Sequence, residues 1–169
     1  MSDYNDDDEL EQGAGLEPTP ASLAHYLEEQ YVGDDRFETI EVLDPSPHEG
    51  EAVRVCFSYD DVSQFFVAVL EEDGLVRVGL MTQEKALSER LESAAQESAD
   101  SLTEFLEVSL ESGEELDHEV QHFHDDAFYF CSDIPYQRDD DLASEILRDE
   151  IIYYLDGYIG AFYGLLDEA

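Results

Sequence analysis

Residues 53–81 read VRVCFSYDDVSQFFVAVLEEDGLVRVGLM, and this stretch decides the fold. Large apolar residues alternate with smaller or polar ones over residues 53–59 and again over 75–81, which is typical of strands with one buried face. Residues 65–71 are apolar on both faces, as expected of a central strand. An Asp-Gly pair at residues 73–74 supplies the tight turn between the last two of these strands. The stretch therefore predicts an antiparallel meander.

The residues before this meander predict one helix and one more strand. Thr19 and Pro20 are a helix start, because threonine caps a helix and proline fits its first turn. Apolar residues at helical spacing follow, and Gly33 ends the helix. Residues 37–43 then alternate as a strand, which closes in the loop that begins at Asp44.

The residues after the meander predict a helix, a hairpin and a last helix. Thr82 caps the helical stretch 83–112, which is either one helix or two helices divided at the serine-rich residues 93–101. Residues 120–131 alternate on both sides of an Asp-Asp turn and predict a second hairpin. Apolar residues at helical spacing then continue to Leu166 and predict the last helix.

Together these elements predict an α+β domain. Its antiparallel sheet, a meander plus a hairpin, is packed with three helices, one at each end of the chain and one in the middle. Residues 19–169 are expected to form this single domain. Residues 1–18 are acidic and lack any apolar period, so they predict a disordered acidic leader.

The order of these elements over residues 19–166 resembles the layout of type III secretion chaperone-like domains, including the YbjN family of small bacterial proteins. The chain departs from that layout because residues 37–43 add a fourth strand before the middle helix, where the layout has three. Domains of this kind bind other proteins, often as dimers, and are not catalysts. The resemblance therefore implies a chaperone-like or adaptor role, and it assigns no individual residues.

The charge balance is extreme. The chain has 45 Asp and Glu against 7 Lys and Arg, a net charge of −38, and Lys85 is its single lysine. Repulsion among these charges is weakened in dense salt, where the Debye length falls to about 3 Å at 1 M. The composition, which also lacks tryptophan, resembles that of cytoplasmic proteins from salt-in halophilic archaea. A mimic of DNA is the rival interpretation, but a mimic needs its acids in one stripe, and here they occur in every element.

The sequence argues against nucleic-acid and membrane partners. No basic residue has a basic neighbour in the sequence, although phosphate contacts need clustered cations. The first residues are neither basic nor apolar, and the apolar stretch 151–166 is broken by Asp156 and three glycines. We therefore expect a cytoplasmic protein. Free thiols are the default for Cys56 and Cys131 in that compartment, although a disulfide between them stays possible.

Histidines cluster in the second hairpin and suggest a metal site. On a strand, His122 and His124 point to the same face, and His118 and Asp126 would complete a ligand set. The pattern His-x-His-x-Asp resembles the start of the metallo-β-lactamase signature, which implies a metal-dependent hydrolase. That signature continues with a histidine, and Ala127 stands there instead.

A polar strand face near a turn explains the same histidines without a metal. In that interpretation, the histidine rings pack beside Phe128 and Phe130. Elsewhere the sequence contains no nucleophile elbow, phosphate-binding loop or dinucleotide fingerprint, so we expect no cofactor. Arg54 and Arg77 occupy outward positions on two strands, where they either form one cationic spot or pair with the chain's own carboxylates.

The last helix carries apolar residues on more than one face, which suggests a second covered surface. Three glycines, at 157, 160 and 164, suggest a close approach by another element. Burial between the sheet and the middle helix explains both features, and so does an interface with a homodimer or another protein. The predicted interface residues are Tyr154, Tyr158, Ile159, Phe162 and Tyr163.

Three hypotheses for function follow. The first is a non-enzymatic protein-interaction domain, chaperone-like or adaptor, that binds a protein partner or a second copy through hydrophobic surfaces in a halophilic cytoplasm. The alternative is a small metal-dependent hydrolase built on the histidine cluster. The third is an acidic protein that mimics DNA.

Overall fold

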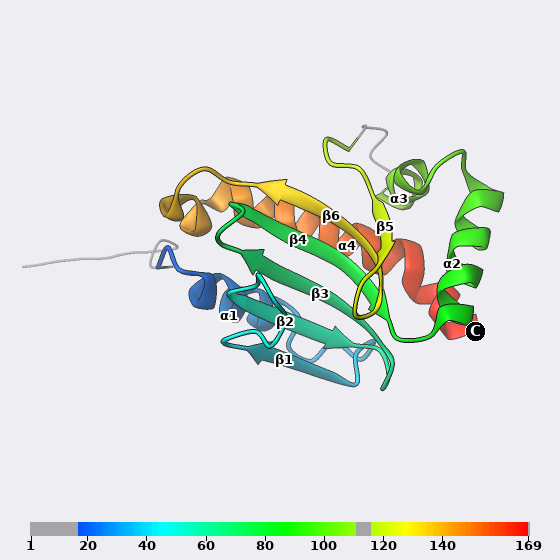
Figure 1. Ribbon diagram of the computed structural model, residues 1–169, viewed down its shortest axis with the longest axis horizontal. Helices are drawn as coiled ribbons and strands as arrows, with labels where there is room; N and C mark the ends of the chain where they lie inside the picture. The colour runs from blue at the N-terminus through cyan, green and yellow to red at the C-terminus, as the bar shows by residue number, and fades with distance from the viewer. Residues whose placement is uncertain (1–16, 111–115, 169) are drawn as a thin grey trace, which may run out of the picture.

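The computed structural model describes residues 17–110 and 116–168, which form an antiparallel sheet of six strands and four α-helices (Figure 1). The α+β class and the antiparallel sheet are confirmed, with four helices where the sequence predicts three. The strands are β1 (Thr39–Leu43), β2 (Val53–Ser58), β3 (Ser63–Leu70), β4 (Leu75–Thr82), β5 (Gln121–His124) and β6 (Phe128–Pro135). The helices are α1 (Pro20–Gln30), α2 (Lys85–Ser98), α3 (Leu102–Leu110) and α4 (Glu145–Glu168), and a short 3₁₀ helix, η1 (Asp139–Ala143), precedes α4.

The strands follow the order β1-β2-β3-β4-β6-β5, and every neighbouring pair is antiparallel. The predicted meander is therefore present, with the predicted strand at residues 37–43 as its edge strand β1. Gly74 has a positive φ of 66° in the turn between β3 and β4, a conformation that favours glycine. The second hairpin joins the sheet through β6, which leaves β5 at the other edge.

Two helices replace the single middle helix. α2 ends at Ser98 and α3 begins at Leu102, so the break falls at the end of the serine-rich segment. After the break, α3 packs against α4, while α2 lies beside the C-terminal end of α4 (Figure 1). Of the two possibilities left open by the sequence, the divided helix is correct.

One face of the sheet, the inner face, is covered by helices. Figure 1 shows α1 and α4 behind the sheet, where they contact β2, β3 and β4. Phe57, Phe65, Leu80 and Phe130 form a row across four strands on this face, and all are fully buried. Each such side chain contributes about 1.5–3 kcal/mol by its removal from water. The inner face is therefore the main hydrophobic core.

The opposite, outer face carries a second, smaller apolar cluster that includes Phe66, Met81 and Tyr129. None of the described helices covers it, and the loop of residues 44–52 crosses it instead (Figure 1). Gly79 lies in the middle of this face, where a Cβ would collide with the backbone of β6. Any larger residue at this position would push β4 and β6 apart.

Cys56 and Cys131 lie in one row of the outer face, separated by Phe66 on β3 and Gly79 on β4. Three strand spacings place their backbones about 14 Å apart, too far for a disulfide. Both are free and buried. Burial raises the pKa of the Cys56 thiol to about 11 and that of the Cys131 thiol to about 12, so both stay protonated at neutral pH.

The predicted acidic leader lies almost entirely outside the described residues, which begin at Glu17. Across the part of the chain that is described, no helix combines the length and the apolar character needed to cross a bilayer.

Candidate functional site

The residues predicted to form an interface on α4 lie mostly in the core. Tyr154, Tyr158, Ile159 and Phe162 are at most 2% exposed, and Tyr163 is partly buried, with its ring edge-on to that of Tyr59. Four of the five are therefore buried within the chain itself in this fold, and an interface at these residues stays a prediction.

The reason for this burial is that α4 is packed on two sides. The sheet covers one side, where the Tyr158 hydroxyl hydrogen bonds with the Ser132 hydroxyl of β6 at 2.8 Å. α3 covers the other, where Leu110 lies so close to Gly157 that a Cβ would sit 3.0 Å from its methyl group. Among the described residues, none has an atom within 4 Å of a Cβ built at Gly160. The glycine pattern therefore marks a close approach at residue 157 but none at 160.

The histidines of the second hairpin pack against aromatic rings. His122 stacks on Phe130 with ring centres 4.0 Å apart, and His124 stacks on Phe128 at 4.3 Å. The Nδ1 of His122 also lies 3.0 Å from the backbone oxygen of Tyr129. The interpretation of a polar strand face with histidines beside two phenylalanines is confirmed.

The predicted metal ligands do not converge. His118 lies 3.3 Å from Glu150 of α4, whereas Asp126 lies on the outer face, 2.8 Å from His48. Within residues 17–110 and 116–168, no group of three or more His, Cys, Asp or Glu side chains could hold a metal ion. The four predicted ligands His118, His122, His124 and Asp126 therefore do not form one cluster, since Asp126 lies on the outer face and the histidines lie on the side of the helices.

Arg54 and Arg77 both point to the outer face, and each is paired within the chain. Arg54 is 1% exposed, bonds both carboxylate oxygens of Glu51 at 2.9 and 2.6 Å, and lies over the ring of Phe66. Arg77 bonds both carboxylate oxygens of Asp133, at 2.7 and 3.0 Å. Both guanidiniums are therefore neutralised internally and do not form a free cationic spot.

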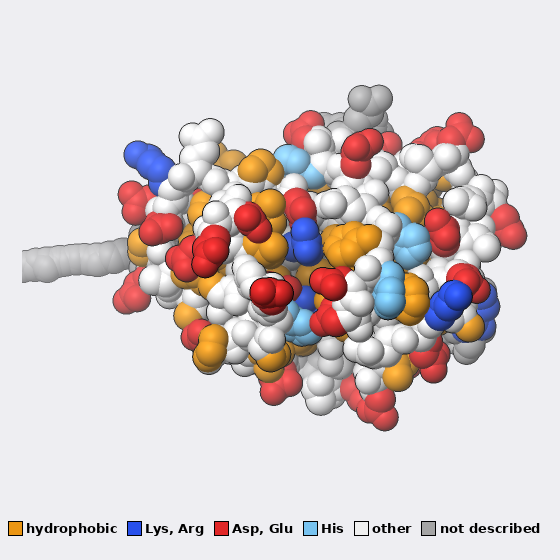
Figure 2. Space-filling view, in the orientation of Figure 1, with side chains coloured by type: hydrophobic (Ala, Val, Ile, Leu, Met, Phe, Trp, Pro, Cys, Tyr) orange, Lys and Arg blue, Asp and Glu red, His pale blue; other side chains and the backbone are white. Residues whose placement is uncertain are grey.

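A polar hollow of about 290 Å³ lies beside the loop of residues 44–52 on the outer face. His48 from the loop reaches Asp126, which also accepts a hydrogen bond from the Tyr129 hydroxyl at 2.8 Å. Burial alone would raise the pKa of Asp126, but these two contacts lower it overall. Figure 2 shows the acidic side chains of this face scattered among hydrophobic, histidine and basic ones. The visible arrangement is not the single stripe that a DNA mimic needs.

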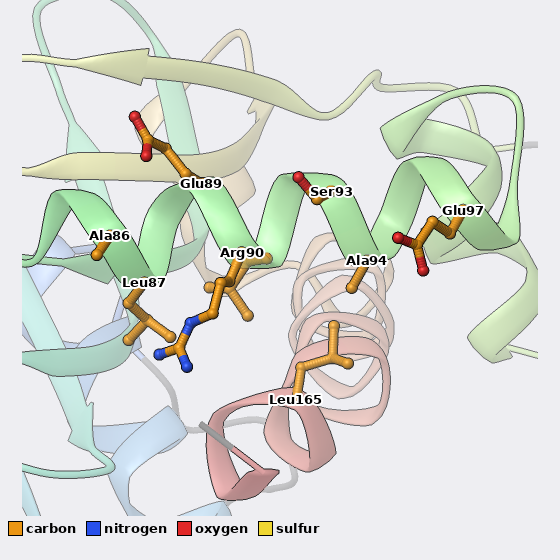
Figure 3. Close-up of a pocket in the computed structure, with 9 residues that line it drawn as sticks. Ala86, Leu87, Glu89, Arg90, Ser93, Ala94, Glu97 and Leu165 are labelled. Carbon is orange, nitrogen blue, oxygen red and sulfur yellow. The ribbon is translucent and has the colours of Figure 1, made fainter.

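The larger hollow is a groove of about 590 Å³ between α2 and the C-terminal end of α4. Its apolar lining comes from Leu87, Leu91 and Ala94 of α2 and from Leu165 of α4 (Figure 3). Leu87 and Leu91 reach the core, whereas Ala94 and Leu165 stay partly exposed. The volume lies in the range of small-molecule ligand sites. We regard this groove as the candidate functional site.

Small residues on α2 create the hollow. At Ala86 and Ala94, two turns apart on one side of the helix, the side chains are too short to fill the space beside α4. Figure 3 shows Leu165 directed from α4 toward Ala94 across the groove. The alanines within residues 83–112 can be seen in the sequence and indicate a helix side with little volume. The depth of the groove depends on how α2 and α4 meet, which the sequence does not show.

Comparison of the chain with protein-family models, with curated proteins and with solved structures found no match.

Proposed function

We propose that this protein is a non-enzymatic protein-interaction domain, adaptor or chaperone-like in role, that binds a partner in the groove between α2 and α4. The groove carries the proposal, because it combines partly exposed apolar side chains with a volume of about 590 Å³. The resemblance in element order to chaperone-like domains supports the same class of function. The proposed binding surface therefore differs from the one predicted from the sequence. It lies at the C-terminal end of α4 and not on the side of α4 that packs in the core.

We propose further that the protein works in the concentrated salt of a halophilic cytoplasm. The net charge of −38 opposes association with other acidic proteins at low ionic strength. Dense salt screens that repulsion, and kosmotropic salts strengthen apolar contact. An apolar groove is therefore a suitable binding device for such a solvent.

A photo-crosslinking amino acid at residue 93 tests the proposal. Ser93 is exposed and lines the groove, whereas Val108 on α3 is 64% exposed and lies outside it, so residue 108 is the matched control position. In host lysate at molar KCl, we expect one partner to crosslink at position 93 and not at 108. Mass spectrometry of the crosslinked band identifies that partner.

Two further variants show whether the captured partner occupies the groove. We expect Leu165→Asp, which places a charge on its wall, and Ala94→Tyr, which fills it, to abolish the crosslink at position 93. The control Val108→Asp should leave it unchanged. Equal crosslinking at positions 93 and 108, or full crosslinking in a folded Ala94→Tyr variant, contradicts the proposal.

A further inference from the structure

Arg148 in the first turns of α4 is a buried cation without an acid beside it. It is 8% exposed, and its guanidinium lies over the ring of Tyr26 of α1, 4.7 Å from the ring centre. It forms no ion pair with any residue in the described ranges 17–110 and 116–168. The other arginine that is buried there, Arg54, bonds both carboxylate oxygens of Glu51. The two buried guanidiniums are therefore treated differently by the fold.

The guanidinium of Arg148 has a donor that nothing accepts. Its Nε is enclosed and has no hydrogen-bond partner in the part of the chain that the structure describes. The ring of Tyr26 attracts the positive charge, but it leaves Nε without an acceptor. An enclosed donor on a charged group is costly unless an acceptor meets it. The site therefore lacks an acceptor, and a negative one would suit it best.

Burial separates Arg148 from the exposed cations of the chain. Lys85, Arg90 and Arg138 also form no ion pair within the described residues, but all three are exposed and water solvates their charges. Arg148 is closed off from water at Nε. The missing acid is therefore unusual at Arg148 and ordinary at the exposed positions.

The start of α4 supplies further donors. The amide of Arg148 donates to the carbonyl of Ser144 at 3.0 Å, and the amide of Leu147 lies 3.4 Å from the hydroxyl of the same serine. Within the described residues, this leaves the amides of Glu145 and Ile146 without an acceptor. The positive end of the helix dipole lies at the same place.

The side chain of Arg148 and these amides share one end of α4. Side chains on a helix lean toward its N-terminus and meet the residues three and four positions away, here Glu145 and Ser144. Helix α1, which carries Tyr26, also contacts η1, which leads into α4 (Figure 1). The guanidinium therefore lies between Tyr26 and the first turn of α4. Glu145 is exposed and forms no ion pair with it.

From this arrangement we infer that Arg148 and the first turn of α4 bind a chloride ion. The inference is independent of the groove between α2 and α4. The Nε–H of Arg148 and the amides of Glu145 and Ile146 are donors for a small anion that accepts from any direction. One guanidinium charge and the helix end, equivalent to about half a charge, neutralise a single negative charge.

Other acceptors fit less well. A phosphate group carries up to two charges and at least three strongly accepting oxygens, which is more than this enclosed site can satisfy. A water molecule would accept the hydrogen bond from Nε but would leave the charge unmatched. In molar KCl, chloride is also abundant enough to fill a site of modest affinity.

Bromide tests the location of the site, because it replaces chloride on the same donors and scatters X-rays anomalously. Crystals of the full chain grown with KBr in place of KCl should show an anomalous peak within hydrogen-bond distance of Arg148 Nε. Peaks only at exposed cations such as Arg90, or an ordered water at this position instead, overturn the inference. The unsubstituted protein is used, so the result does not depend on whether a variant folds.

Chlorine-35 NMR tests the site in solution, because exchange with a bound state broadens the chloride line. We expect Arg148→Gln to remove most of the broadening that the protein causes, and Arg148→Lys, which keeps the charge, to remove less. The control Arg36→Gln, at an exposed arginine paired with Asp34, should leave it unchanged. Circular dichroism establishes that each variant is folded, and full broadening in a folded Arg148→Gln variant contradicts the inference.

Thermal unfolding identifies the class of anion. At equal ionic strength, the midpoint difference between the unsubstituted protein and Arg148→Gln should be about 3–6 °C larger in KCl than in potassium acetate or potassium phosphate. A larger difference in either of the other salts assigns the site to an oxyanion and overturns chloride. An equal difference in all three salts overturns an anion site.

Discussion

The two faces of the sheet are buried by different means. On the inner face, helices α1 and α4 cover aliphatic and aromatic side chains such as Phe162, which has no exposed surface. On the outer face, a loop covers a core that includes the ion pair of Arg54 with Glu51, whose side chains are 1% and 6% exposed. Stability on the inner face therefore depends on packed volume, whereas on the outer face it also depends on matched charge.

The largest expected effect comes from removing volume on the inner face. Phe162→Ala deletes a ring that packs against Phe105, Phe130 and Tyr158. We expect the free energy of unfolding to fall by about 3–5 kcal/mol, because the surrounding side chains refill the cavity only in part. Urea denaturation in molar KCl measures this change.

The control for this prediction is Val108→Ala, at a residue that is 64% exposed. We expect it to change the free energy of unfolding by less than about 0.5 kcal/mol. If Phe162→Ala lowers the free energy of unfolding by less than about 1 kcal/mol, α4 is not packed on the sheet as described. Phe162 would then again be a candidate for an interface residue.

The next effect comes from breaking the charge match on the outer face. Glu51→Ala leaves the buried Arg54 guanidinium without its carboxylate, and its contacts with the Tyr129 hydroxyl and the Met81 sulfur do not supply a counter-charge. We expect a loss of about 3 kcal/mol in the free energy of unfolding. Thermal unfolding in molar KCl, followed by circular dichroism, measures it.

Two comparisons show whether the loss comes from the unpaired charge. The double variant Arg54→Met with Glu51→Leu removes both charges and should recover most of the stability. Asp34→Ala breaks an exposed pair with Arg36 and should cost about 1 kcal/mol or less. If the double variant is as unstable as Glu51→Ala, the two faces do not differ in the way described.

The sequence was sufficient for features that depend on neighbouring residues. Period-two alternation around the Asp-Gly turn predicts the meander, and the serine-rich segment marks the point where α2 ends and α3 begins. The second hairpin is also predicted from neighbouring residues, although its connection is the three residues 125–127 and not a two-residue turn, and this length pairs His122 with Phe130. Each of these features joins residues close in sequence, and the widest pair, Ser63 with Thr82, is 19 positions apart.

The features that the sequence did not predict depend on contacts between distant segments. An apolar residue such as Tyr158 is equally consistent with a core or an interface, and the choice is made by β6 and α3, which come from other parts of the chain. The groove likewise joins Ala94 to Leu165, which are 71 positions apart. The burial of Arg54 required knowledge that the loop containing Glu51 folds back over the sheet.

The smallest expected effect is a dependence on pH at the edge of the outer face. Asp133 is partly buried, which by itself raises its pKa, but hydrogen bonds from Arg77 and Gln121 lower it overall. A carboxyl whose pKa is lower in the folded state stabilises the fold above its unfolded pKa of about 3.9, and that contribution is lost as the pH falls through the folded value.

Asp133→Asn should therefore lower the free energy of unfolding by about 1 kcal/mol or less at pH 7 and leave it unchanged at pH 2. Unfolding curves of this variant and of the unsubstituted protein from pH 2 to pH 7 measure the difference. If the loss in the free energy of unfolding in Asp133→Asn is the same at every pH in this range, the carboxylate stabilises the fold through its shape and not its charge. Charge matching then does not contribute to stability at this edge of the outer face.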